Sequence, residues 1–171
     1  MNYLMKQLIL ILKDCYNGGF KMKIIDRLIQ FLTLFILGGG VYVLIELLYR
    51  GRSHPTMFLL GGLCFYMIGL INEIYPWDMP LVSQMLISTF IVTALEFIFG
   101  IVLNVWLHLG IWDYSMLPYN LCGQICLLFS IIWFFLSALA IIVDDFVRWK
   151  IFNEEKPRYH IFYSHCEDRH K

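Results

Sequence analysis

Glu96 is the residue best placed to do chemistry in this sequence, because it lies inside an otherwise apolar stretch. It belongs to a series of polar and small residues spaced three or four apart: Thr89, Thr93, Glu96, Gly100 and Asn104. This spacing places the series on one face of a helix. An ionisable side chain costs roughly 2.5–3.5 kcal/mol to insert into a bilayer, so it usually faces protein or water. Glu96 therefore either lines a path for a substrate or forms a structural hydrogen bond with a neighbouring helix.

A second pair of charges lies near the end of an earlier apolar stretch. Arg50 follows Glu46 at i+4, which is the favourable order for an ion pair on a helix. We expect this pair to join an outer polar cluster, with Tyr114 beside it, made of Glu46, Arg50, Arg52, Glu96, Asn104 and Asp113. The pair then has two interpretations: part of a substrate path, or a structural ion pair that fixes helix register.

Polar residues also gather at the inner ends of two apolar stretches. Asn72 and Glu73 end one stretch, and Asp144, Asp145 and Arg148 end another. Ordinary solvation at the membrane surface is the simplest interpretation of these residues. The alternative is that Asn72 and Glu73 belong to a polar core or substrate path.

The sequence predicts no metal or cofactor site. Cys122 and Cys126 fall on one face of an expected helix, and we interpret them as small packing residues rather than a redox or metal pair. Near the end of the chain stand His160, His165, Cys166 and His170. Their spacing matches no standard metal site.

Four apolar stretches are long enough to carry these residues across a membrane, since a spanning helix needs roughly 20 apolar residues. We expect spans over 27–49, 57–75, 81–104 and 121–143. The expected fold is an all-α integral membrane protein, a four-transmembrane-helix bundle. Glycines that would let its helices approach closely are Gly62, Gly69, Gly100 and Gly123. Tryptophans that would anchor it at the interfaces are Trp77, Trp106, Trp112 and Trp149.

The chain divides into three regions. Residues 22–148 form the four-helix transmembrane domain, and residues 149–171 form a polar cytoplasmic tail. Two interpretations of residues 1–21 stay open: an amphipathic helix on the inner membrane surface, or a non-native start ahead of Met22. Lysine and arginine are concentrated on the side of the two termini, which predicts a cell-membrane protein with both termini in the cytoplasm.

Composition requires lipid as a solvent for this chain. Hydrophobic residues make up 60% of it and charged residues only 15%, against about 25% charged in a soluble domain. Mean hydropathy is +0.69. The formal net charge of zero gives no reason to expect a nucleic-acid partner.

Several strings in the sequence are typical of one family. They include Thr93-x-Leu95-Glu96-Phe97-x2-Gly100-x3-Asn104 and Ile111-Trp112-Asp113-Tyr114-Ser115-x2-Pro118-x-Asn120, with Gly69-x2-Asn72-Glu73 earlier in the chain. Together, from about residue 37 to 148, they resemble the bacterial putative ABC-transporter type IV family, also named CmpB-like ABC transporter permeases. The resemblance implies a permease-like role in a transport system, with no substrate and no catalytic residues attached.

The sequence is consistent with three possible functions. The first is a transport component that works with a separate ATPase subunit or as a homo-oligomer, since four spans are few for a complete pathway. The second is a membrane scaffold, sensing or assembly protein in which polar faces only hold helices together. The third is a membrane enzyme with Glu96 or Asp113 as acid or base, which ranks last because no catalytic motif supports it.

Overall fold

The fold is taken from a computed structural model that describes residues 19–74 and 79–160, with side chains described for 24–72 and 79–160. The two interpretations of the N-terminal extension therefore concern residues outside the described part, apart from the start of the first helix. Trp77, His165, Cys166 and His170 also lie outside it, as does the side chain of Glu73.

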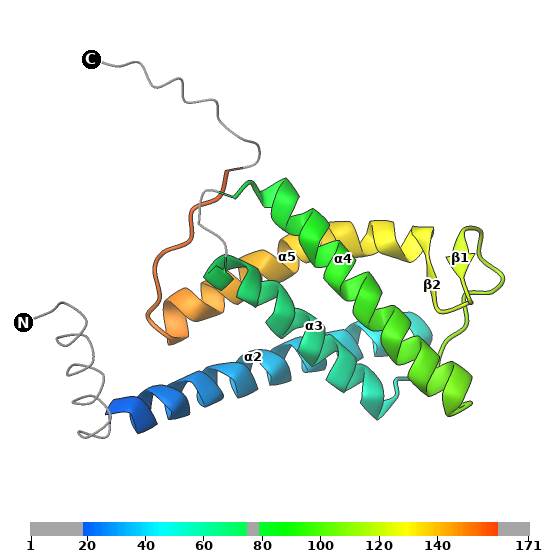
Figure 1. Cartoon of the computed structure of the whole chain (residues 1–171), viewed down its shortest axis with the longest axis horizontal. Helices are drawn as coiled ribbons and strands as arrows, with labels where there is room; N and C mark the ends of the chain where they lie inside the picture. Colours follow the sequence, from blue (N-terminus) through cyan, green and yellow to red (C-terminus); the bar gives the residue numbers. More distant parts are fainter. Residues whose placement is uncertain (1–18, 75–78, 161–171) are drawn as a thin grey trace, which may run out of the picture.

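Long apolar helices make up almost the whole described chain (Figure 1). They are α2 (Gly19–Arg50), α3 (Pro55–Ile74), α4 (Leu81–Gly100) and α5 (Leu127–Ile151). α4 continues into a π-helix, η1 (Ile101–Trp106). Within residues 19–74 and 79–160, four helices are long and apolar enough to cross a membrane, so the predicted four-helix membrane bundle is confirmed.

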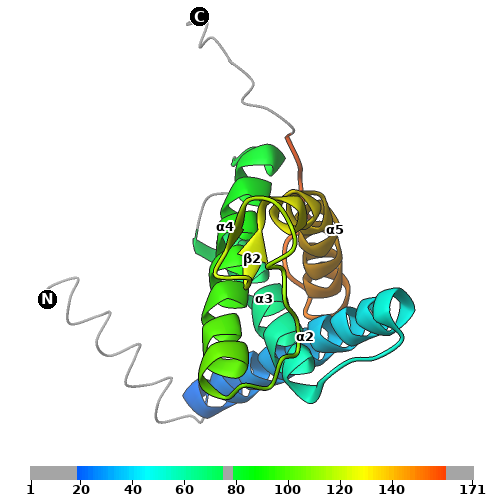
Figure 2. The same ribbon diagram turned by 90° about the vertical axis from the view of Figure 1, so that its right-hand side faces the viewer.

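The helices run alternately, so the bundle has two distinct ends. We call the end where α2 and α4 finish the hairpin end, and the end where α3 and α5 finish the tail end. α3 lies in the middle and contacts α2, α4 and α5, whereas α2 and α5 make no extensive contact with each other (Figures 1 and 2). Buried apolar residues of the core come from α3, α4 and α5, among them Leu60, Cys64, Ile68, Met85, Val92 and Ile141.

Glycines bring the backbones of α2 and α3 together. A Cβ atom at Gly62 would lie 2.6 Å from the carbonyl oxygen of Phe35, and one at Gly39 would lie 2.5 Å from that of Phe58. Lipid chains are as apolar as the side chains they surround, so the hydrophobic effect does not drive helices together in a membrane. Close van der Waals packing of this kind drives their association instead. The expectation that Gly62 serves helix packing therefore has a geometric basis.

The predicted start of the fourth helix is wrong. Residues 120–126 form a small antiparallel hairpin of β1 (Asn120–Leu121) and β2 (Ile125–Cys126), and α5 begins only at Leu127. The Asn120 side chain donates to the carbonyl groups of Ser115 and Leu117, at 3.2 and 2.7 Å, and accepts from the Gly123 N–H. These local bonds give the backbone an alternative to a helical turn.

Gly123 consequently has a different role from the helix packing that its spacing suggests. Its φ is +68°, in the left-handed region that favours glycine, and it lies in the hairpin turn. Cys122, at φ 52°, lies in the same turn, so Cys122 and Cys126 do not share a helix face. Trp112, expected as an interfacial anchor, is instead buried in the core.

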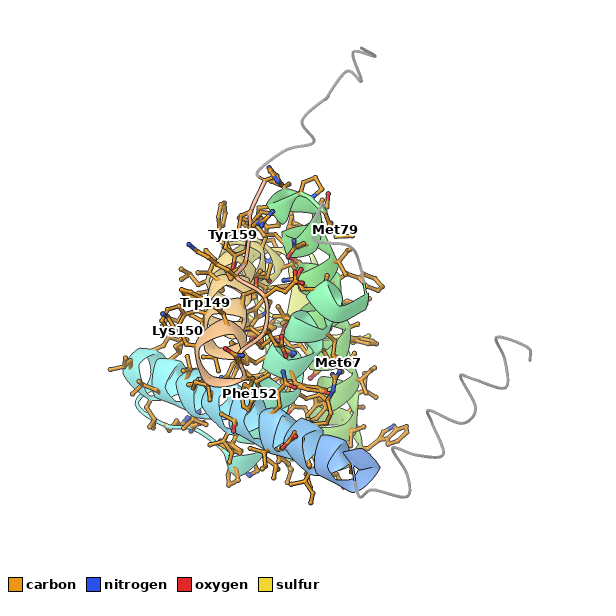
Figure 3. The ribbon with its side chains drawn as sticks, turned by 90° about the vertical axis from the view of Figure 1, so that its left-hand side faces the viewer. Met67, Met79, Trp149, Lys150, Phe152 and Tyr159 are labelled. Carbon is orange, nitrogen blue, oxygen red and sulfur yellow. The ribbon has the colours of Figure 1, made fainter. Side chains whose placement is uncertain are left out.

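The boundary between the last helix and the tail also differs from the expected one at residue 148. α5 continues to Ile151, and Asn153 then adopts a left-handed conformation with φ 55°, which ends the helix. Residues 152–160 return along the bundle to the start of α4, where the Leu81 N–H donates to the His160 carbonyl at 2.8 Å. Figure 3 shows this segment passing from Phe152 to Tyr159, towards Met79.

The α2–α3 contact gives a first testable prediction. Replacing Gly62 by leucine should destabilise the bundle by about 1–3 kcal/mol or more, because the added side chain meets the Phe35 backbone. Gly40→Leu is the matched control, because a Cβ atom there has nothing within 4 Å. The control should be neutral or stabilising by up to about 1 kcal/mol through helix propensity. Thermal unfolding of both variants in detergent measures the difference, and equal stability of the two would contradict the packing.

Candidate functional site

Glu96 lies at the centre of a polar cluster near the hairpin end. The side chain is only 3% exposed, although it sits within a membrane-spanning segment. Its Oε1 accepts a hydrogen bond from the Tyr114 hydroxyl at 3.0 Å, and its Oε2 accepts one from Trp133 Nε1 at 3.1 Å. One donor comes from the loop after η1 and the other from α5, so the carboxylate joins α4 to both.

The loop carrying Tyr114 is held against the bundle by amide side chains. Asn104 donates to Gln124 Oε1 at 2.8 Å and accepts from the Ile111 N–H at 2.7 Å. Trp112 Nε1 donates to the Gln124 carbonyl at 2.9 Å. Gly100 leaves the space for Gln124, since a Cβ atom at Gly100 would lie 2.6 Å from Gln124 Oε1.

The π-helix η1 contributes to the same arrangement. Asn104 lies inside it, between the α-helical part of α4 and the loop. Its wider turn is closed by a hydrogen bond of 3.0 Å from the Leu107 N–H to the Val102 carbonyl. π-helical turns occur often at functional sites, and this one follows Glu96 in the sequence.

Glu46 and Arg50 form the expected pair on the facing helix. Their side chains are 3.3 Å apart, and Glu46 Oε2 accepts from the Ser53 hydroxyl at 2.5 Å. Arg50 also donates to the Ile111 carbonyl at 2.8 Å, so α2 is tied to the same loop as Glu96. Burial is the main reason why the pKa of Tyr114 is raised, and the negative charge of Glu96 raises it further. The Tyr114 hydroxyl therefore stays protonated and remains a hydrogen-bond donor.

Most of the expected outer residues meet in this cluster, which we call the hairpin-end cluster. It contains Glu46, Arg50, Glu96, Asn104 and Tyr114. Two expected members do not join it. Arg52 is exposed, and exposed Asp113 accepts from the Ser115 N–H at 2.8 Å in a local turn.

Four further members of the hairpin-end cluster were not expected as site residues: Tyr42, Ser53, Gln124 and Trp133. Tyr42 shares a helix face with Glu46, and Trp133 lies on a seam of small and polar residues in α5, so sequence spacing carries a signal for these two. Gln124 carries no such signal, because its position depends on the hairpin turn.

A second cluster, the tail-end cluster, joins α3, α5 and the returning tail. Arg148 Nε lies 2.6 Å from Asp144 Oδ2, and the Asp144 side chain is fully buried. Asn72 donates to both oxygens of Asp145, at 2.9 and 3.0 Å, and the Tyr159 hydroxyl donates to Asp145 at 2.8 Å. The interpretation of these carboxylates as solvated surface groups is therefore wrong.

The returning tail supplies part of this cluster. Glu154 lies 3.7 Å from Arg148 Nη1 and accepts from Gln30 of α2 at 2.5 Å, which ties the first helix to the tail. Burial raises the pKa of Tyr159, and its hydrogen bond to Asp145 raises it further, so its hydroxyl remains a donor. Gly69, expected at a helix contact, packs directly against the Asp144 carboxylate, where a Cβ atom would collide.

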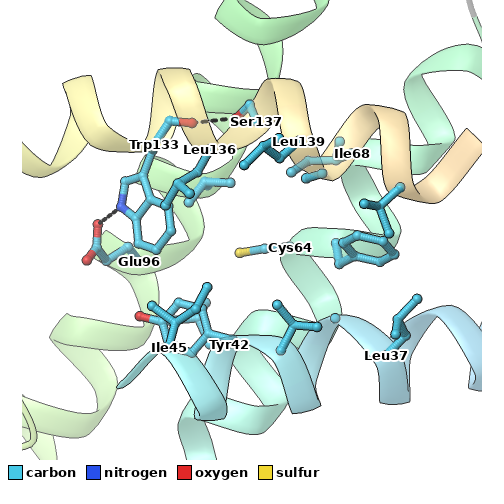
Figure 4. Close-up of a pocket in the computed structure, with 17 residues that line it drawn as sticks. Leu37, Tyr42, Ile45, Cys64, Ile68, Glu96, Trp133, Leu136, Ser137 and Leu139 are labelled. Carbon is cyan, nitrogen blue, oxygen red and sulfur yellow. Dashed lines mark hydrogen bonds between the residues drawn. The ribbon is translucent and has the colours of Figure 1, made fainter. Parts of the chain in front are cut away.

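An apolar cavity of about 220 Å³ lies between the two clusters. All four long helices contribute to its lining, and Glu96, Tyr42 and Trp133 stand at its hairpin end (Figure 4). Tyr42 and Trp133 stack across this end with ring centroids 5.8 Å apart and planes inclined by 21°. Within the described residues, no group of three or more His, Cys, Asp and Glu side chains is arranged to hold a metal ion.

Comparison with known families agrees with this architecture. The sequence model of the family described as "Putative ABC-transporter type IV" matches residues 24–165. The chain belongs to this family. The match covers all four candidate spans and both polar clusters, so the resemblance seen in the sequence is confirmed. No curated protein and no solved structure matches the chain significantly. The protein is therefore a multi-pass membrane protein of a transport-related family.

The bond between Trp133 and Glu96 gives a second prediction. Trp133→Phe keeps an aromatic ring but removes one of the two donors to a buried carboxylate, and should lower stability by about 1 kcal/mol or more. Trp149→Phe is the control, since Trp149 makes ring contacts at the tail end. Chemical unfolding in detergent measures both variants. A Trp133→Phe variant no less stable than the control would show that the bond contributes nothing.

The tail-end cluster gives a third prediction. Arg148→Leu leaves the buried Asp144 carboxylate without its ion-pair partner and should destabilise the protein by about 3–5 kcal/mol. Lys150→Leu, at the outer surface of the same helix, should have little effect. Thermal unfolding distinguishes the two variants, and similar melting temperatures would mean that the pair does not hold the cluster together.

Proposed function

We propose that this chain is a permease-like subunit of a transport system, located in the cell membrane. The observation that carries the proposal is the position of Glu96, a buried carboxylate that lines a cavity bounded by all four helices. Ionisable residues inside a membrane are rare and usually mark substrate or ion pathways. Membership of the transport-related family supports the same conclusion.

The two polar clusters lie at opposite ends of the cavity. Trp133, which binds Glu96, is about 16 Å along α5 from Asp144, at 1.5 Å per residue. The lining between them includes Leu136, Leu139 and Val143. This arrangement of a polar group, an apolar cavity and a second polar group supports a substrate path between the two clusters, which the stacked rings of Tyr42 and Trp133 close at the hairpin end. We assign Glu96 as the group that contacts the substrate at the hairpin end.

The orientation that we propose puts both termini in the cytoplasm. Among the described residues, Lys21, Lys23, Arg27, Lys150, Lys156 and Arg158 lie on the tail-end side, and Arg50 and Arg52 lie on the hairpin-end side. The ammonium groups of Lys150 and Lys156 lie 3.9 and 5.7 Å from the centroid of the Trp149 ring. Tryptophan flanked by lysines is typical of the cytoplasmic membrane interface.

A separate ATPase subunit is the partner that we propose. These 171 residues contain no phosphate-binding GxxxxGK[ST] loop, which agrees with ATP being bound by a separate subunit. The connection from Ile74 to Leu81 is short for a coupling helix. The end of α5 and the tail that follows it are therefore the surfaces that we expect to contact the ATPase.

A scaffold or assembly protein is the second candidate, because close glycine contacts such as those between α2 and α3 also serve helix pairs with a purely structural role. The two candidates differ in what Glu96 does. In a scaffold, Glu96→Gln would be tolerated, since an amide oxygen can still accept a hydrogen bond. In a transport subunit, the same change removes the charge that meets the substrate.

The experiment that tests the proposal has two steps. Affinity purification of the tagged protein from its native membrane in mild detergent should recover an ATP-binding subunit in stoichiometric amounts. The reconstituted complex should then lose ATPase-coupled transport or substrate-stimulated ATPase activity with Glu96→Gln, by roughly 10²-fold if the group acts during each cycle. The matched control is the corresponding carboxylate-to-amide change at exposed Asp26 of α2, Asp26→Asn, which should leave activity unchanged. Recovery of the protein alone, or a fully active Glu96→Gln complex, would contradict the proposal.

A further inference from the structure

The cavity beside Glu96 opens sideways, between α2 and α5. Several of its lining residues are also exposed at the surface of the bundle: Val41 and Ile45 on α2, and Leu139 and Val143 on α5. Leu139 is 61% exposed. Since these residues belong to membrane-spanning segments, the mouth of the cavity faces the hydrocarbon of the bilayer. The cavity is therefore a lateral groove that lipid-soluble molecules can reach without passing through water.

The inner wall of this groove, opposite its opening between α2 and α5, is formed by α3 and α4. Leu60, Cys64 and Ile68 of α3 line it, and Cys64 is only 8% exposed (Figure 4). Its lining is almost wholly aliphatic or aromatic, so a hydrocarbon chain would lose no polar contacts on entering. A helix of another protein could not fill the groove as far as Glu96. An α-helix is about 10 Å across, and the hairpin end of the groove is closed by the stacked rings of Tyr42 and Trp133, whose centroids are 5.8 Å apart.

The closed end of the groove supplies hydrogen-bond acceptors. Glu96 uses each carboxylate oxygen once, for Tyr114 and Trp133, and an ionised carboxylate has about four acceptor sites. The Tyr42 hydroxyl, beside it, makes no hydrogen bond with any residue that the structure describes. A ligand that fits both features has an apolar chain and a small hydrogen-bond donor at one end.

We propose that the groove between α2 and α5 is a binding site for a membrane lipid that inserts one hydrocarbon chain along α3 and places a hydroxyl group against Glu96. The lipid enters from the side, through the mouth in the bilayer. This inference does not depend on the transport function, because binding alone requires only the groove and its polar end.

Photolabelling of the full chain in lipid nanodiscs tests the proposal. The probe is a long-chain primary alcohol with a diazirine in its chain, and its methyl ether, which lacks the donor, is the comparison. Lipid at the outer surface can label only outward residues, whereas a chain in the groove reaches Leu60 and Cys64. Mass spectrometry that locates the label to single residues should find the alcohol on Leu60 or Cys64, with the methyl ether labelling them about tenfold less, as a loss of about 1.4 kcal/mol in binding would produce.

Two variants check that the label comes from the groove. Ala140→Phe fills it and should abolish labelling of Leu60 and Cys64, whereas Gly40→Phe adds the same bulk on an open helix surface and should not. If Ala140→Phe does not fold, competition on the unchanged protein replaces it, and excess unlabelled alcohol should displace the probe where the ether does not. Label confined to outward residues, or equal labelling by both probes, would overturn the proposal. Loss of the ATPase partner would leave the result unaffected, so the two proposals fail separately.

Discussion

Most of the polar side chains placed inside the apolar helices find hydrogen-bond partners within the chain, because the bilayer core offers no water. This requirement explains the least regular parts of the structure. The loop that follows η1 turns inward to bring Tyr114 to Glu96, and the tail returns to bring Tyr159 to Asp145. In both cases a connecting segment is folded against the bundle by a carboxylate that the membrane cannot solvate.

Glycines provide the space that these buried polar groups and the close helix contacts need. Gly69 and Gly100 leave room for the side chains of Asp144 and Gln124, whereas Gly39 and Gly62 let helix backbones approach. Small residues therefore serve two functions here: they bring apolar helices into van der Waals contact, and they accommodate polar groups between helices. The gap that remains, between α2 and α5, is the lateral groove, and Glu96 connects it to the hairpin-end cluster.

The sequence predicts the spans and the polar face of α4 well, because helical spacing and hydropathy depend on local composition alone. The Glu46–Arg50 pair follows from the same spacing and is present. What could not be predicted depends on contacts between distant residues. The start of α5 is set by the bonds that Asn120 makes in the preceding loop, and the pattern of residues 121–126 does not distinguish a helix from a hairpin. Burial of Asp144 and Asp145 depends on Asn72 and on a tail that appears solvated when considered alone.

Disulfide trapping tests most directly whether the polar face of α4 turns inward onto α5. The hydroxyl oxygens of Thr93 and Ser130 lie 3.5 Å apart, next to Glu96 and Trp133. In a protein without its native cysteines, Thr93→Cys with Ser130→Cys should form an intramolecular disulfide readily in the membrane under mild oxidation. Phe90→Cys with Ser130→Cys is the control, because Phe90 is 75% exposed. If the Thr93 pair stays reduced while the Phe90 pair cross-links, the helix is turned the other way and the Glu96 cluster does not exist as described.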